Sequence, residues 1–107
     1  MSIKYTIHWS DKAIESLTAI EEFISQVSPS KAVRVVRELV IYARHLLMFP
    51  YMGVTDERFG NDNLRKLIKG EHLLVYEVRG TRIEIINVFS GKQDFQARFI
   101  SEHEGLD

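Results

Sequence analysis

Hydrophobic and polar residues alternate with a period of two at the start of the chain and again in its second half. The first alternating apolar residues are Ile3, Tyr5, Ile7 and Trp9. This period predicts a half-buried strand over residues 3–9. Three more strands are predicted over 64–69, 73–78 and 82–89, with links short enough for tight hairpins. The last run changes phase at Ile85-Ile86, which indicates a bulge or a strand buried on both faces.

Between the first strand and the other three, apolar residues recur at helical spacing. The first helix is predicted over 11–26, because Ser10 stands where an N-cap belongs and apolar residues follow at intervals of three and four. Ser28-Pro29 begins the second helix, since serine suits the cap and proline suits the first helical position. Phe49-Pro50 ends it. A link this short predicts antiparallel neighbouring helices.

The predicted order is strand, helix, helix, strand, strand, strand (β-α-α-β-β-β) in a single domain over 1–107. The helical hairpin is expected to return the chain to the end where it left the first strand. We therefore expect a four-stranded, fully antiparallel sheet with the antiparallel hairpin on one face, which is an α+β two-layer domain. Residues 50–63 are predicted to form a loop. Residues 95–107 are expected to form a short helix and a flexible tail.

Composition and charge narrow the functional classes. The formal net charge is −1, so the chain lacks the overall basic excess of most nucleic-acid-binding proteins. There is no cysteine, and no apolar run approaches the roughly 20 residues of a membrane span. The N-terminus also lacks the apolar core of a signal peptide. Four histidines show no metal-ligand spacing. We therefore expect a cytoplasmic protein that has no metal, no cofactor and no membrane partner.

Several segments, taken in order, resemble the RelE/ParE family of toxins over roughly residues 3–95. The segments that carry this resemblance are Trp9, Ala13, Leu17 and Ile20, Phe49-Pro50-Tyr51-Met52-Gly53, Leu64-Arg65-Lys66-Leu67, Leu74-Val75-Tyr76-Glu77-Val78, and Ile83-Glu84-Ile85-Ile86-Asn87-Val88-Phe89-Ser90-Gly91-Lys92-Gln93-Asp94-Phe95. The resemblance implies a RelE/ParE-like fold. It also implies a type II toxin that arrests growth and belongs to a plasmid stabilisation system. A cognate antitoxin is then expected to neutralise the toxin by forming a toxin–antitoxin hetero-oligomer with it.

The resemblance implies one of two branches, which differ in their cellular target. RelE-like members cleave mRNA on the ribosome. ParE-like members inhibit DNA gyrase by protein–protein binding and are not known to be enzymes. The near-neutral charge and Ser90, at the place where some ribonucleases carry histidine, favour the ParE-like branch. The alternatives are a RelE-like, metal-independent endoribonuclease acting on the ribosome and mRNA, and an inactive homologue that only binds antitoxin.

Candidate catalytic residues follow from the ribonuclease alternative. Metal-free RNA cleavage needs an acid, a base and cations for the charge that develops on phosphate. Arg65 occupies the position of the family's strand-borne arginine, and Arg82 and Lys92 are the other candidate cations. Tyr76 lies in an apolar strand, which favours a core tyrosine with a hydrogen-bonded hydroxyl over a catalytic acid.

Large apolar residues outside the predicted helices and strands are the candidate partner-binding residues. They are Tyr51, Met52, Phe59, Phe95 and Phe99. One interpretation is that they cover the ends of the core. The other is that they form a docking surface for an antitoxin helix or an added strand.

Overall fold

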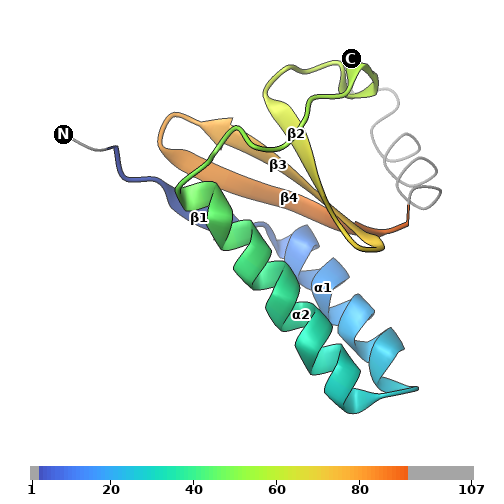
Figure 1. Cartoon of the computed structure of the whole chain (residues 1–107). Coiled ribbons are helices and arrows are strands. Elements are labelled where there is room, and N and C mark those ends of the chain that lie inside the picture. Colours follow the sequence, from blue (N-terminus) through green and yellow to red (C-terminus); the bar gives the residue numbers. More distant parts are fainter. Residues whose placement is uncertain (1–2, 92–107) are drawn as a thin grey trace.

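Two helices pack on one face of a four-stranded sheet in the computed structural model, which describes residues 3–91 apart from the side chain of Phe59 (Figure 1). The elements are β1 (Thr6–Trp9), α1 (Asp11–Ser25), α2 (Pro29–Arg44), η1 (His45–Leu47), η2 (Glu57–Phe59), β2 (Leu64–Lys69), β3 (His72–Arg79) and β4 (Arg82–Ser90). The α+β prediction is confirmed. The tail predicted over 95–107 lies outside the described residues.

Serine side chains begin both long helices, as the sequence predicted. The Ser10 hydroxyl accepts the N–H of Ala13 at 3.0 Å, and the Ser28 hydroxyl accepts the N–H of Lys31 at 3.3 Å. These bonds satisfy N–H groups that have no partner within the first helical turn. The second helix ends earlier than predicted, at Arg44, and a 3₁₀ turn follows it. Neither helix is long and apolar enough to cross a bilayer.

The sheet is mixed, so the prediction of a fully antiparallel sheet is wrong. The strand order is β1-β4-β3-β2, and β1 runs parallel to β4. The reason lies in residues 48–63, which do not lead directly from the helical hairpin into β2. Val54 forms an antiparallel bridge with Lys66, so this segment runs alongside β2 in the opposite direction before the chain turns back (Figure 1). β2 therefore runs in the same direction as β1.

A bulge in β4 explains the phase change that the sequence showed. Val75 pairs with Asn87 while the next residue, Tyr76, pairs with Ile85, which leaves Ile86 as an extra residue in β4. Ile85 packs in the core beneath the helices, and Ile86 packs against apolar residues on the opposite face. The bulge therefore lets two consecutive isoleucines serve different faces of the sheet.

The sheet buries apolar side chains on both faces. The larger cluster lies between the sheet and the helices, and its members include Ala13, Ile20, Leu39, Ala43, Leu46, Leu67, Leu74, Tyr76, Ile83, Ile85 and Val88. A smaller cluster of Leu73, Val75 and Phe89 lies on the other face. This double burial accounts for the near-continuous apolar run in β3.

Candidate functional site

An exposed apolar segment over residues 47–54 joins η1 to the bridge with β2. Its exposed apolar side chains are Leu47, Met48, Phe49, Tyr51, Met52 and Val54. Tyr51, one of the predicted partner-binding residues, is 58% exposed, and Met52 is 38% exposed. These two residues therefore lie on the surface of the protein.

Tyr76 of β3 fixes the backbone of this apolar segment from below. Its side chain is fully buried, as the sequence predicted. The hydroxyl accepts the N–H of Gly53 at 2.9 Å and donates to the carbonyl oxygen of Pro50 at 2.8 Å. Burial raises the pKa of the Tyr76 phenol, and the Gly53 N–H and the Arg65 guanidinium offset part of that rise. The phenol therefore stays protonated near neutral pH and is already engaged as a donor.

Gly53 is the point of closest approach between the apolar segment and the sheet. A Cβ atom at this position would lie 2.6 Å from Cε1 of Tyr76 and 2.8 Å from the carbonyl oxygen of Lys66. Real Cβ atoms do not come this close to other heavy atoms. Only glycine therefore lets the backbone N–H reach the buried hydroxyl.

The side chain of Arg65, in β2, forms hydrogen bonds with the same backbone. It is the cross-strand neighbour of Tyr76, and its Nη1 donates to the carbonyl oxygen of Gly53 at 2.7 Å and to that of Tyr51 at 3.3 Å. Its guanidinium carbon also lies 5.1 Å from the centre of the Tyr51 ring, which is within range of a cation–π contact. We refer to Arg65 and Tyr76 together as the clamp.

Arg82, the second candidate cation, is not brought near Arg65. Because side chains alternate along a strand, Arg82 points away from the face on which its neighbour Ile83 is buried beneath the helices. Arg65 shares the face of Leu67, which lies in that same core. Arg82 instead pairs with Glu84, with 3.0 Å between Nε and Oε2. The two arginines therefore lie on opposite faces of the sheet.

Four of the predicted site residues have no described side chain. Lys92, Phe95 and Phe99 lie outside residues 3–91, and the side chain of Phe59 is not described. Within residues 3–91 no three histidine or acidic side chains gather in a way that could hold a metal ion.

The residues after the apolar segment are held to β2 by an ionic group. The carboxylate of Asp56 accepts Nζ of Lys66 at 2.8 Å and Nε of Arg58 at 3.0 Å. The bonds to Arg58, and then those to Lys66, hold the pKa of Asp56 well below its usual range. Arg58 and Lys66 are therefore both bonded to this carboxylate.

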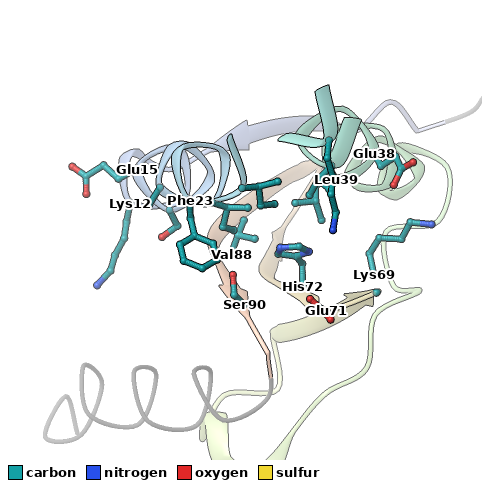
Figure 2. A pocket seen from close by; sticks show the side chains of 17 residues that line it. Lys12, Glu15, Phe23, Glu38, Leu39, Lys69, Glu71, His72, Val88 and Ser90 are labelled. Atoms are coloured by element: carbon teal, nitrogen blue, oxygen red, sulfur yellow. The ribbon is translucent and has the colours of Figure 1, made fainter. Parts of the chain in front are cut away.

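A groove of about 1070 Å³ lies between the helices and the turn that joins β2 to β3. Its apolar lining comprises Ala19, Ile20, Phe23, Ile24, Val35, Leu39 and Val88, and its charged lining comprises Lys12, Glu15, Lys31, Glu38, Lys69 and Glu71. Phe23 and His72 lie on either side of Val88 (Figure 2). Burial lowers the pKa of His72, which favours its neutral imidazole, and the nearby Glu71 offsets part of this shift.

Sequence reasoning did not find this groove, because it forms from segments that are far apart in the chain. One signal was available. Phe23 widens the apolar stripe of α1 toward its polar side, and it is 72% exposed in the structure. A large aromatic at such a position is typical of a binding surface.

Comparisons with known proteins identify the family. The chain has the fold of a chain of the chromosomal ParDE TA system from P. aeruginosa, with a TM-score of 0.72, 22% identity, and coverage of 85% of this chain and all of that one. It also matches a chain of the toxin–antitoxin complex RelBE2 from Mycobacterium tuberculosis, with a TM-score of 0.57, 18% identity, and coverage of 84% and 100%. No curated protein matches. The family model described as the ParE toxin of the type II toxin–antitoxin system parDE matches residues 7–95, so the chain belongs to the ParE toxin family.

Proposed function

We propose that this toxin inhibits DNA gyrase by protein–protein binding in the cytoplasm, without enzymatic chemistry of its own, and that a cognate antitoxin neutralises it. The observation that carries the gyrase proposal is the engagement of Arg65. Its Nη1 donates to two backbone carbonyl oxygens, and Arg82 is paired with Glu84 on the opposite face. Arg65 and Arg82 therefore do not lie together as a pair of cations for a phosphate transition state.

The ribonuclease alternative finds less support at the same place. Tyr76 is a poor general acid, because its hydroxyl is buried and already donates to Pro50. His72 is the cross-strand neighbour of Lys69 at the start of β3. It lies four residues from Tyr76 along that strand, a separation of about 13 Å at the usual rise of a strand. Tyr76 and His72 therefore do not form an acid–base pair beside Arg65.

The proposal is tested with the purified full chain in two parallel assays. We expect loss of gyrase supercoiling activity at stoichiometric toxin and no cleavage of mRNA on programmed ribosomes. Pulse labelling after induced expression should show DNA synthesis falling before protein synthesis. Ribosome-dependent mRNA cleavage with intact supercoiling would overturn the proposal in favour of the ribonuclease. The absence of both activities would favour an inactive antitoxin-binding module.

We further propose that the antitoxin occupies the groove between the helices and the β2–β3 turn. Both structural neighbours come from toxin–antitoxin systems, which supports an antitoxin partner. The apolar lining with charges of both signs around it suits an amphipathic helix, which would bury its apolar stripe and pair its flanks with the charged side chains.

A charge placed in this groove should weaken antitoxin binding without unfolding the toxin. Phe23→Glu removes an aromatic side chain that is 72% exposed, so we expect the unfolding midpoint to change little. Antitoxin affinity, measured by calorimetry, should fall by about 10- to 100-fold, as for a typical interface hot spot. Val33→Glu is the matched control, because Val33 is 53% exposed on α2 and does not line the groove. Equal losses in the two variants would contradict the assignment.

A further inference from the structure

The apolar segment over residues 47–54 exposes more apolar side chains than a connection between η1 and β2 requires. Six of its eight residues are apolar and exposed, and they are Leu47, Met48, Phe49, Tyr51, Met52 and Val54. Tyrosine, phenylalanine and methionine are enriched at protein–protein interfaces. A concentration of large exposed apolar side chains on a small domain is typical of an interaction site.

The backbone beneath these side chains is fixed over the whole segment. Besides the clamp, Val54 and Lys66 exchange two backbone hydrogen bonds, at 3.0 and 2.9 Å. Phe49 donates its N–H to His45 at 3.0 Å, and Met52 donates its N–H to Phe49 at 3.1 Å. A segment ordered in this way does not have to be ordered again on binding, so its apolar contacts contribute more of their energy to affinity.

We infer that the apolar segment is the surface that contacts the target protein, and that Arg65 and Tyr76 are positioning residues that present it. This inference rests on the proposed function, in which the toxin acts by binding a protein. Arg65 then acts through Tyr51 and Met52, and not through a phosphate.

Two observations favour the target over the other partners. No residue of the apolar segment lines the groove that we propose for the antitoxin, so the two surfaces are separate. The basic residues that follow the segment are engaged, Arg58 and Lys66 with Asp56 and Arg65 with backbone carbonyls. Asp56 therefore offsets part of the positive charge that a nucleic acid would need at this place.

Arginine has a particular advantage at position 65. Its planar guanidinium donates to two carbonyl oxygens and at the same time lies over the Tyr51 ring. A lysine keeps the charge but presents a single ammonium that cannot reproduce this arrangement. Arg65→Lys therefore separates a positioning role from a role of charge alone.

The test is a double-mutant cycle read by gyrase inhibition and by growth arrest on induced expression. We expect Tyr51→Ala and Arg65→Ala each to weaken inhibition by about tenfold or more. The double variant should inhibit gyrase at most about twofold less than the weaker of the two single variants, because both changes act on the same contact. Arg65→Lys should resemble Arg65→Ala. The antitoxin affinity of the two alanine variants, the double variant and Arg65→Lys should stay within about twofold of wild type. A variant that failed to fold would lose this affinity.

Different outcomes overturn different claims. Multiplicative losses in the cycle, or activity retained in Arg65→Lys, would show that Arg65 acts independently of Tyr51 and would overturn the positioning role. Retained gyrase inhibition and growth arrest in Tyr51→Ala and Met52→Ala would overturn the docking surface while leaving the proposed function intact. A wild-type toxin that arrests growth without inhibiting gyrase removes gyrase as the target, and growth arrest by the same variants then still decides the docking surface. Ile14→Ala, at a half-exposed position on α1, serves as the matched control and should behave as wild type.

Discussion

A Gly53→Ala variant is expected to lose about 2–3 kcal/mol of unfolding free energy, the upper part of the range for an overpacked interior site. The added Cβ would lie 2.6 Å from Cε1 of Tyr76, 2.7 Å from its hydroxyl oxygen and 2.8 Å from the carbonyl oxygen of Lys66. None of these atoms moves cheaply, because the ring is fully buried and the carbonyl belongs to β2. For a chain of this size the loss corresponds to a fall of roughly 10–20 °C in the melting temperature.

Gly70→Ala provides the comparison for this variant. Gly70 has a φ of 61°, and nothing lies within 4 Å of the position of an added Cβ. Its replacement should therefore cost only about 1 kcal/mol, from the left-handed backbone alone. Gly53 is not among the residues with positive φ, so its larger cost would come from the close contacts. Equal losses by chemical denaturation would contradict the steric explanation.

Local chemistry made the helices and strands predictable. Ser10 and Ser28-Pro29 carry their own capping preferences, and the strand predicted over 64–69 has the bounds observed for β2. The direction of β1 relative to β4 was not predictable in this way. It depends on the path of residues 48–63, and their proline and glycine content indicates a loop without indicating where the loop leads.

The site was predictable only in part, because its residues meet across long stretches of sequence. Tyr51, Met52 and Arg65 were each singled out, and the structure brings Arg65 to the backbone of Tyr51. The contact joins residues 14 apart with no periodic relation, so no pattern could assign the arginine to a carbonyl. The pairing of Arg82 with Glu84 was within reach, since residues two apart share a face of a strand.

A Tyr76→Phe variant should lose about 2 kcal/mol of unfolding free energy at neutral pH. Without the hydroxyl, the N–H of Gly53 and the carbonyl of Pro50 both lose their partner beside a buried ring. Cross-strand packing of the ring is retained, so the fold should survive. Urea denaturation of both proteins at pH 8 measures this difference.

The same difference should shrink as the solution becomes alkaline. Burial raises the pKa of Tyr76 in the folded protein above the value of about 10 expected in the unfolded chain. The folded state therefore holds this proton more tightly, and the stability it provides is fully present below pH ~10 and is lost as the pH rises through the folded pKa. The variant has no such group, and both proteins share the remaining tyrosines. A gap of equal size at pH 8 and at pH ~10.5 would mean that the hydroxyl of Tyr76 does not hold the apolar segment through a protonated hydrogen bond.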